Sequence, residues 1–421
     1  KIWGTSPDSI DAAEDRDRFI EILKELNIRQ PRNGIARSEK EAVKIANDIG
    51  FPLVVRPSYV LGGRGMEIVY DNEELAQYMQ NEVIVESEHP VLIDSFLNNA
   101  IEVDVDALAD AEGNVVIGGI MEHIEQAGIH SGDSACSLPT VSIPYAAMVT
   151  IRRWTVELAK KLKVVGLMNI QWAVQGTDVY ILEANPRASR TVPFVSKAIG
   201  RPLAKLASLV MSGKTLAEVG FTSELIPKHV SVKEAVLPFD KFAGADVLLS
   251  PEMRSTGEAM GIGSSFAAAY AKAQMAAGSK LPTEGTVFIS MQNRDKEAAV
   301  ALARDFIDMG YKVVATRGTY AHLIANGLNP PEVELTLKIN EGRPNTLDRI
   351  KQGEIALFIS TPDKKSEHRS GRELRRAVIA NKIPIVTTVA AAQAIAQALR
   401  ILKSQELDVQ AMQDYHPQYA Q

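Results

Sequence analysis

The chain has 421 residues, of which 46% are hydrophobic and 23% charged, a composition ordinary for a protein with two or three packed domains. Its formal net charge is −6 and it has no basic run, so nothing indicates nucleic acid binding. The apolar runs have strand length, which argues against a membrane span. The single cysteine, Cys136, excludes an internal disulfide framework and favours a reducing, cytoplasmic location.

Two helices are predicted near the start of the chain. Apolar residues recur at helical spacing over residues 11–26 and again over 38–49. Ser38 followed by Glu41 is typical of a helix start, and Gly50 of a helix end. The chain begins without methionine and without a targeting pattern, and we therefore expect a piece of a longer or split polypeptide.

Strands then follow one another in runs, with helices grouped between them. Strands are predicted at PLVVRPS, MEIVYD, VLIDSF, EVDVDALAD and NVVIGGIMEHI, and a long helix over residues 145–163. Such runs favour an α+β domain with mixed or antiparallel sheets rather than a doubly wound one. We assign this domain to residues 1–200.

A predicted β-hairpin carries the most chemistry. The segments NIQWAV and DVYILEAN flank the turn GTD, and alternation along the second segment places Glu183 and Asn185 on one face. Across the hairpin, Gln171 can join them. One carboxylate and two amide oxygens beside Arg187 and Arg190 suit a divalent metal that carries nucleotide phosphates. A surface hairpin with polar decoration is the alternative.

Three further features could contribute to a binding site. The glycine-rich loop with Gly62 and Gly63 lies between two predicted strands, where it is either a phosphate-covering loop or a simple hairpin turn. Arg16 and Arg56 could bind phosphate bidentately or be surface charges. The segment MEHIEQAGIHSGDSACSLP is dense in polar groups and indicates a site, although its residues lack the spacing of a zinc site.

The remainder of the chain has two further parts. Residues 201–278 are Ala-rich and are predicted to be a mostly helical connector packed on the first domain. Over residues 279–421, strands and helices alternate in short units, which predicts an α/β domain with a parallel sheet. The segment from Thr316 to Thr319 follows one of these strands and is a reasonable phosphate pocket.

Several motifs resemble one family of enzymes. The segments AEDRDRF, VVRPSYVLGGRGMEIVY, MEHIEQAGIHSGDSACSLP, MNIQWAV, ILEANPRASRTVPFVSKA and EMRSTGEAMG stand in the same order as in the carboxy-terminal half of the large subunit of carbamoyl phosphate synthetases. The resemblance implies an ATP-grasp domain, and the tail from about residue 283 is similar to the family's methylglyoxal-synthase-like regulatory domain.

The resemblance also implies roles for individual residues. Arg187 and Arg190 would hold carbamate and the transferred phosphoryl group, and Gln171, Glu183 and Asn185 would be Mg²⁺ or Mn²⁺ ligands. Ser95 stands where some relatives have histidine. The residues implied to bind ATP are Arg16, Arg56, Gly62, Gly63, Leu97, Glu102, Gly128, Ile129, His130, Ser131, Gln171 and Glu183.

The implied activity is ligase chemistry: phosphorylation of carbamate by ATP, the last step of carbamoyl phosphate synthesis for arginine and pyrimidine biosynthesis. A biotin carboxylase or another ATP-grasp ligase is one alternative. The other is an inactive fragment that only binds nucleotide and effectors, because the subdomain that precedes ATP-grasp in the family is missing. The implied partners are a glutamine amidotransferase small subunit and the amino-terminal half of the large subunit, in an oligomer.

Regulatory sites are implied as well. Segment Ser360-Thr361-Pro362 departs from the pattern of relatives that bind uridine monophosphate, and its proline removes a backbone donor. Residues that match a nucleotide monophosphate site are Lys296, Thr316, Gly318, Thr319 and Lys338. Those that match the site for the activator ornithine are Glu125, Asp133, Glu234 and Thr387. Potassium is implied at Glu102, His123, Glu125 and Ser131.

Overall fold

The computed structural model describes residues 2–57, 65–81, 90–239, 241, 247–361 and 369–416. The chain divides into two compact units. The first comprises Lys1–Val230, Leu249–Arg254 and Gln410–Gln421, and the second Ser231–Leu248 and Ser255–Val409. Within the described ranges, no helix is both long and apolar enough to cross a membrane. Gly62 and Gly63 of the predicted phosphate loop lie outside them.

The first unit begins with two short helices, α1 (Pro7–Glu14) and α2 (Arg16–Glu25), where one helix was predicted over residues 11–26. Asp15 adopts an extended conformation between them, and its carboxylate accepts a hydrogen bond from the Arg18 amide at 2.9 Å. Asp15 therefore ends one helix and caps the next, a preference of aspartate that the apolar periodicity alone does not reveal.

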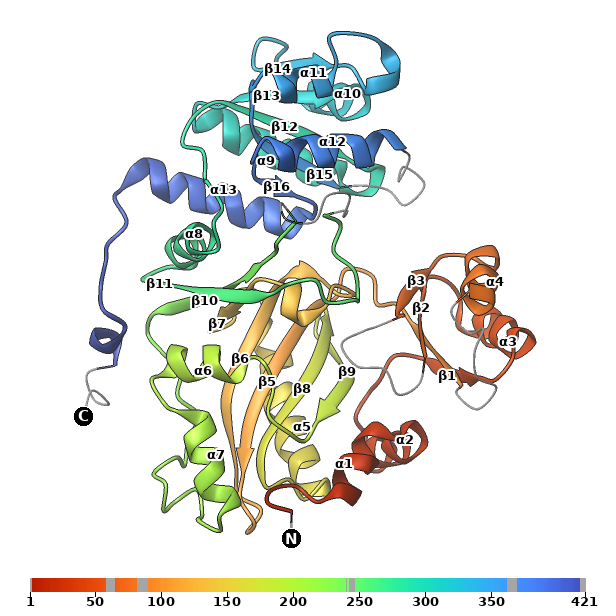
Figure 1. The fold of residues 1–421 in the computed structure, drawn as a ribbon, viewed down its shortest axis with the longest axis vertical. Helices are drawn as coiled ribbons and strands as arrows, with labels where there is room; N and C mark the ends of the chain where they lie inside the picture. The colour runs from red at the N-terminus through yellow and green to blue at the C-terminus, as the bar shows by residue number, and fades with distance from the viewer. Residues whose placement is uncertain are drawn as a thin grey trace. The chain divides into compact units, whose positions relative to one another are not determined.

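A small antiparallel sheet follows, covered by two helices, α3 (Glu39–Ile49) and α4 (Asn72–Asn81) (Figure 1). As predicted, the Ser38 hydroxyl caps α3 and Gly50 ends it. Buried residues such as Leu53, Ile93 and Leu75 form the core between the sheet and the helices. The strands lie in the order β1 (Asn33–Ala36), β4 (Val91–Ser95), β2 (Leu53–Pro57) and β3 (Glu67–Val69).

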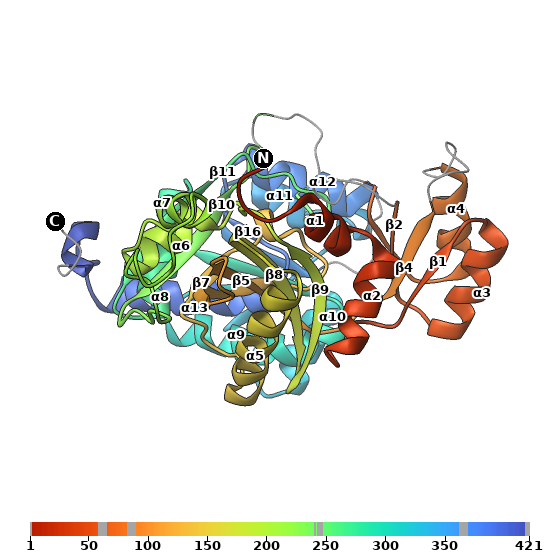
Figure 2. The ribbon, with the colours of Figure 1, turned by 90° about the horizontal axis from the view of Figure 1, so that it is seen from below.

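A larger antiparallel set of strands forms the centre of the first unit. Helix α5 (Tyr145–Lys161) covers one face, while α6 (Val192–Ile199) and α7 (Leu203–Met211) pack elsewhere against its strands (Figure 2). The predicted hairpin is present as β8 and β9. The strands lie in the order β7 (Cys136–Leu138), β6 (Val115–Gln126), β5 (Ile101–Ala109), β8 (Gly166–Gln175) and β9 (Asp178–Asn185).

Strand β5 separates an apolar layer from a polar one. Val103 and Val105 belong to the core beneath α5. Because side chains alternate along a strand, Glu102, Asp104 and Asp106 lie on the opposite face. All three carboxylates are buried. The core under α5 therefore fixes which face of this sheet is polar, and the candidate site lies on that face.

The second unit begins with strands where a helical connector was predicted. β10 (Val230–Val236) and β11 (Gly257–Gly263) are neighbours, and α8 (Phe266–Ala276) packs on β11. The prediction that residues 201–278 are mostly helical was wrong. Lysine and glutamate in β10, and glutamate and glycine in β11, are uncommon in strands, so neither segment has a clear strand pattern. In β11, a side chain at Gly261 would meet the α8 backbone at 2.1 Å, so glycine is needed for the close approach of helix and strand.

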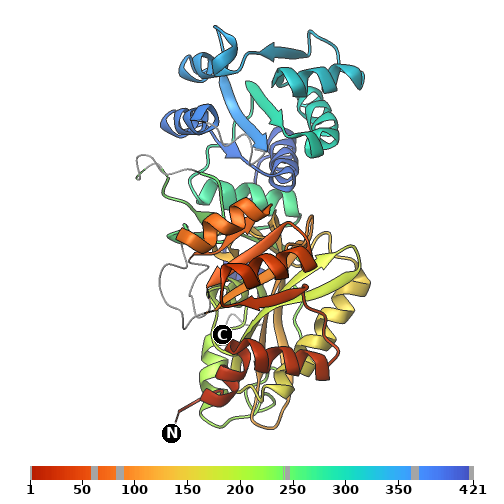
Figure 3. The ribbon, with the colours of Figure 1, turned by 90° about the vertical axis from the view of Figure 1, so that its right-hand side faces the viewer.

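The rest of the second unit is an α/β layer structure with an all-parallel sheet, as predicted. Helices lie on both faces of the sheet (Figure 3). The strands lie in the order β14 (Val333–Thr336), β13 (Lys312–Thr316), β12 (Thr286–Met291), β15 (Ile355–Thr361) and β16 (Ile385–Val386). The helices are α9 (Lys296–Asp308), α10 (Arg317–Ala325), α11 (Thr346–Lys351), α12 (Arg369–Ala380) and α13 (Val389–Ser404).

Both sheet types confirm the predicted fold class, an α+β part followed by an α/β part. The boundaries of the three-part division at residues 200 and 278 stay a prediction.

Candidate functional site

A cavity of about 240 Å³ lies in the first unit, lined by α1, α2, the small sheet and the polar face of the larger sheet. It gathers residues from positions 14 to 251 of the chain. The sequence-predicted residues that line it are Arg16, Arg56, Ser95, Leu97, Glu102, Gly128, Ile129, His130, Ser131, Gln171, Glu183, Asn185 and Arg187.

The hairpin brings the predicted metal ligands together. Gln171 of β8 is the direct cross-strand partner of Glu183 of β9, so both side chains lie on one face. Asn185 donates from Nδ2 to Glu183 Oε1 at 2.8 Å. Gln171 donates from Nε2 to the Ser131 hydroxyl at 3.3 Å, which makes its Oε1 the atom able to ligate a cation.

The side-chain oxygens of Gln171, Glu183 and Asn185 are suitable ligands for a magnesium ion that binds together with a nucleotide. In the described part of the chain, no three His, Cys, Asp or Glu side chains gather in a way that could hold a metal ion. Mg²⁺ commonly takes one or two carboxylates and completes its shell with phosphate oxygens and water. Glu183 with the amide oxygens of Gln171 and Asn185 is that kind of partial site.

Two arginines share one carboxylate at the wall of the cavity. Arg16 forms an ion pair with Asp94, and Arg56 Nε lies 3.8 Å from the second oxygen of Asp94. Burial lowers the pKa of Arg16, Asp94 opposes this, and the charge of Arg56 lowers it further. Two guanidinium groups against one carboxylate leave a net positive charge, which suits phosphate binding. Asp94 was missed in the sequence, although it interrupts the apolar strand VLIDS.

The polar segment predicted as a site forms a loop over the cavity. The Gly128 amide donates to Glu102 Oε1 at 3.1 Å. A side chain at Gly128 would lie 2.8 Å from the Phe96 ring, so glycine permits this approach. The His130 Nδ1 accepts from the Gly132 amide at 2.9 Å, and burial lowers the pKa of His130. A neutral ring whose Nδ1 accepts can donate from Nε2.

A segment far along the chain completes this loop. Residues Leu249–Arg254 belong to the first unit. The His130 amide donates to the Ser250 carbonyl at 3.0 Å, and the Arg254 amide donates to the carboxylate of buried Asp133 at 2.8 Å. Pro251 lines the cavity. The motif EMRSTGEAMG overlaps this segment, but its contact with the loop was not predicted, because that contact depends on tertiary folding.

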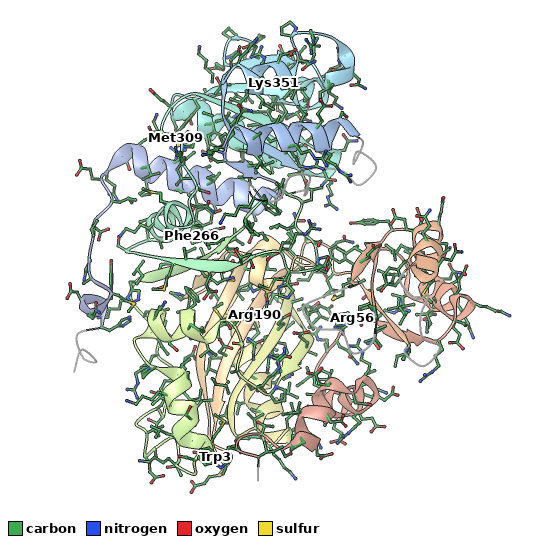
Figure 4. The ribbon with its side chains drawn as sticks, in the orientation of Figure 1. Trp3, Arg56, Arg190, Phe266, Met309 and Lys351 are labelled. Carbon is green, nitrogen blue, oxygen red and sulfur yellow. The ribbon has the colours of Figure 1, made fainter. Side chains whose placement is uncertain are left out.

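Arg187 and Arg190 lie on the loop between β9 and α6. Arg187 lines the cavity and donates from Nη2 to Asn185 Oδ1 at 2.9 Å. Arg190 contacts Met253, and its charge is one of the causes that lower the pKa of His130. Figure 4 labels Arg190 near the end of the larger sheet and Arg56 on the small one. The structure thus places both loop arginines near the cavity, one of them in its wall.

A buried histidine lies behind the cavity wall. His123 Nε2 is 3.2 Å from Asp104 Oδ2, and Nδ1 is 3.4 Å from Glu102 Oε2. Burial alone would lower the pKa of His123, but contacts with Cys136, Asp104 and Glu102 raise it well above its ordinary value. The imidazolium therefore balances two buried carboxylates. Cys136 is buried within this group.

The remaining predicted residues are distributed over both units. Glu125, which accepts from the Ala135 amide at 2.6 Å, and Asp133 belong to the first unit, and Glu234 and Thr387 to the second. Their role in binding ornithine stays a prediction. In the second unit, Thr316 and Thr319 are buried at the carboxyl end of β13, and Lys338 is exposed.

In the second unit, Gly318 lies beside the Lys296 ammonium group, where phosphate binding was predicted. The Thr316 hydroxyl bonds to Ser290 at 2.9 Å and does not cap α10. A side chain at Gly318 would approach Lys296 Nζ at 3.4 Å. The first turn of α10, Gly318 and Lys296 therefore lie close together, which suits an anion. Of the Ser360-Thr361-Pro362 segment, the proline lies outside the described residues.

Two protein families match the chain, one within each of the two units. Residues 15–219 match the family described as the carbamoyl-phosphate synthase L chain, ATP binding domain, and residues 298–387 match the MGS-like domain family.

Individual relatives extend the similarity to the whole chain. The carbamoyl phosphate synthase large chain of Nostoc sp. (strain PCC 7120) is 63% identical over 424 residues, which cover 100% of this chain and 38% of the relative. The arginine-specific, chloroplastic large chain of Oryza sativa is 59% identical over 417 residues, covering 99% of this chain and 35% of the relative. This chain thus spans little more than a third of their length.

A solved structure shares the fold. The biotin carboxylase domain of the 2-oxoglutarate carboxylase from Hydrogenobacter thermophilus, in complex with MgADP, ADP and bicarbonate, aligns with a TM-score of 0.54 and 17% identity. The alignment covers 65% of this chain and 67% of that one. At this identity the likeness concerns the fold alone.

Proposed function

We propose that this chain, which belongs to the family of carbamoyl phosphate synthase large chains, phosphorylates carbamate with ATP to give carbamoyl phosphate and ADP. The observation that carries the proposal is the cavity of the first unit. It combines the carboxylate and amides of the β8–β9 hairpin with the positive charge of Arg16 and Arg56.

The cavity has the parts that a nucleotide needs. Apolar side chains would hold the base, whereas Arg16 and Arg56 would hold phosphate oxygens. His130 would donate from Nε2, and Glu102 would accept from a ribose hydroxyl. The larger apolar residues of the lining are Val54, Met66, Phe96, Leu97, Ile129, Ile181 and Leu182.

Phosphoryl transfer requires alignment and charge neutralisation more than covalent help from the protein. An anionic carbamate oxygen would attack the γ-phosphorus as the bond to the ADP oxygen breaks, so no general base is needed. Arg187 would hold carbamate or the moving phosphoryl group from the cavity wall, and Arg190 would add positive charge beside it. Water must be excluded, because carbamate and carbamoyl phosphate both decompose in water.

Gln171, Glu183 and Asn185 would hold Mg²⁺ or Mn²⁺, which when bound neutralises the charge of the β- and γ-phosphates. Asn185 donates to Glu183, and Arg187 donates to Asn185, so these ligands are oriented by a chain of hydrogen bonds. Potassium is proposed near Glu102, His123, Glu125 and Ser131.

The wider role is proposed from the relatives. Carbamoyl phosphate made here would supply arginine and pyrimidine biosynthesis in the cytoplasm. A glutamine amidotransferase small subunit and the amino-terminal half of the large chain would provide ammonia and carbamate, in an oligomer. Nucleotide monophosphate would bind near Lys296 and Thr316, and ornithine near Glu125 and Asp133.

The proposal is tested by running the reaction backwards on this chain. ADP and carbamoyl phosphate are supplied with Mg²⁺ and K⁺, and ATP is measured by coupled luminescence. ATP that appears with the native chain and is lost in Glu183→Ala supports carbamate phosphorylation. If no ATP appears while calorimetry detects MgADP binding, the chain binds the nucleotide without transferring the phosphoryl group by itself. ATP formed equally by Glu183→Ala contradicts the assigned site.

A further inference from the structure

A buried carboxylate lies beneath the loop that carries the two arginines. Asp106 is on the polar face of β5 and only 1% exposed. Its cross-strand partner on β8 is Asn169, which in turn pairs with Asn185 on β9. Asp106 lies outside the lining of the cavity, so it does not face a ligand there. A carboxylate at such a depth needs hydrogen-bond donors.

Two of its donors come from the arginine loop itself. The Thr191 hydroxyl donates to Asp106 Oδ2 at 2.6 Å, and the Ser189 hydroxyl donates to Oδ1 at 2.7 Å. Asn169 donates to Oδ1 at 3.0 Å. The hydroxyls of Ser189 and Thr191 also lie 2.7 Å from each other. The Asp106 carboxylate therefore holds the loop through hydrogen bonds from two residues, Ser189 and Thr191.

This fastening fixes the residue between them. Arg190 lies between Ser189 and Thr191, whose side chains both bond to Asp106, and its own side chain is exposed and contacts Met253. Its charge is one of the causes that lower the pKa of His130 in the cavity loop. Arg187 precedes the fastened pair and contacts Asn185. The geometry of both arginines thus depends on the position of this short loop.

A purely structural role explains this arrangement less well. Burying an ionised carboxylate is costly, and well-packed apolar residues in such a position often stabilise a fold as much or more. Here the carboxylate bonds to hydroxyls on either side of a functional arginine.

We infer that Asp106 is a positioning residue, which holds Arg187 and Arg190 toward the transferred phosphoryl group by accepting hydrogen bonds from Ser189 and Thr191. The inference rests on the proposed function. Displacement of a reacting group by about an ångström can lower a rate by roughly 100-fold, which sets the size of effect expected.

The test combines Asp106→Asn, Arg190→Ala and the double variant in the full chain. ATP formation from ADP and carbamoyl phosphate is measured with Mg²⁺ and K⁺. We expect Asp106→Asn to lower kcat by about 100-fold, while the KM for MgADP changes less than about 3-fold because Arg16 and Arg56 are untouched. Asp106→Asn should lower kcat much less in the Arg190→Ala background than in the native chain, since part of its effect acts through that arginine and only the part through Arg187 remains.

Asp110→Asn is the matched control. Asp110 lies just beyond the same strand, is equally buried, and fastens a different segment by accepting from the Leu216 amide at 2.9 Å. We expect it to change kcat less than about 3-fold even where it lowers stability. Independent, multiplicative losses in the double variant, or an unchanged kcat in Asp106→Asn, would overturn the inference.

A second readout does not depend on activity. Amide hydrogen exchange over residues 186–191 should accelerate in Asp106→Asn and remain native in Asp110→Asn. If the native chain forms no ATP, the proposed function fails, and unchanged loop exchange in Asp106→Asn would then overturn the positioning role by itself. Where Asp106→Asn does not fold, Ser189→Ala combined with Thr191→Val removes both loop donors and must reproduce the loss of kcat.

Discussion

Single residues of the polar face differ in what surrounds them, and the difference separates chemistry from support. Glu183 is half-buried and lines the cavity, with one hydrogen bond from Asn185. Asp106 is fully buried and accepts three hydrogen bonds from neighbouring side chains. A carboxylate that lines a cavity can bind a ligand. A carboxylate whose oxygens already accept hydrogen bonds from the protein instead orients the side chains that donate those bonds.

Replacing Glu183 by alanine should abolish ATP formation while the melting temperature changes by no more than about 2 °C. The residue lines the cavity, so its removal deletes a ligand position without opening the apolar core. Differential scanning calorimetry beside the ATP assay checks both parts. A drop in melting temperature comparable with that of a core substitution would make Glu183 structural.

Asp106 should impart a pH dependence to stability. Burial raises its pKa from 3.8 to about 6, although Thr191, Ser189 and Asn169 oppose this, and Asp104 raises it further. Because the folded pKa is the higher one, the contribution is complete below about pH 4 and is lost as the pH rises through 6. The stability advantage of the native chain over Asp106→Asn should therefore shrink by about 2 to 3 kcal/mol across this window.

Urea unfolding between about pH 3.5 and 7.5 measures this difference. Tryptophan fluorescence is a suitable probe, because Trp3, Trp154 and Trp172 all belong to the first unit. Parallel stability curves for the native chain and Asp106→Asn would show that Asp106 does not titrate in this range.

At the scale of elements, α6 follows the loop that carries Arg187 and Arg190, and its last turn contacts His416 near the end of the chain. Its last carbonyl groups are capped by two histidines: His229 Nε2 lies 3.0 Å from the Ala198 oxygen, and His416 Nε2 lies 2.9 Å from the Lys197 oxygen. Gly200 ends the helix with a φ of +71°. Such caps satisfy carbonyls that a helix leaves without partners.

Gly200→Ala should destabilise the first unit by more than the left-handed conformation alone explains. That conformation costs about 1 to 2 kcal/mol for a residue with a Cβ. The added Cβ would also lie 2.5 Å from the His416 ring, which packs against the helix end. Thermal unfolding followed by tryptophan fluorescence measures the total loss.

Gly176→Ala is the matched control, since Gly176 has a φ of +62° and nothing within 4 Å of the added Cβ. In a His416→Gly background, which removes the His416 Cβ as well as the ring, Gly200→Ala should cost no more than this control. An equal loss at both glycines would show that the His416 contact does not constrain the helix end.

At the scale of the whole molecule, each of the two units brings together charged side chains at a predicted binding site. The first holds the cavity with its acidic hairpin and arginines. The second places Lys296 beside Gly318 at the start of α10, at the carboxyl end of a parallel strand. Ligands of α/β sheets commonly bind at that end.

Lys296→Ala should weaken binding of uridine monophosphate by about 10-fold or more, the expected effect of losing a charge-assisted hydrogen bond to phosphate. Binding of MgADP should stay unchanged, because the cavity lies in the other unit. Isothermal titration calorimetry with each nucleotide separates the two effects. Lys312→Ala, at the opposite end of β13, is the control and should change neither; a loss equal to that of Lys296→Ala would remove the site from this position.

Local patterns in the sequence determined much of the fold and part of the site. The turn at Gly176 and the alternation along β9 were enough to predict that Glu183 and Asn185 share a face, and the register of β8 brings Gln171 beside them. The parallel sheet followed from the short alternating units after residue 279. Such features are readable because strand period and turn chemistry act over a few residues.

Only the tertiary structure decided which distant residues meet. Asp94 joins Arg16 to Arg56, and residues 249–254 reach the loop that contains His130. Asp106 is one acidic residue among several in β5 until the fold places Ser189 and Thr191 above it. Sequence periodicity identifies the face of a strand on which a side chain lies, but its partners across that face are set by long-range packing between elements.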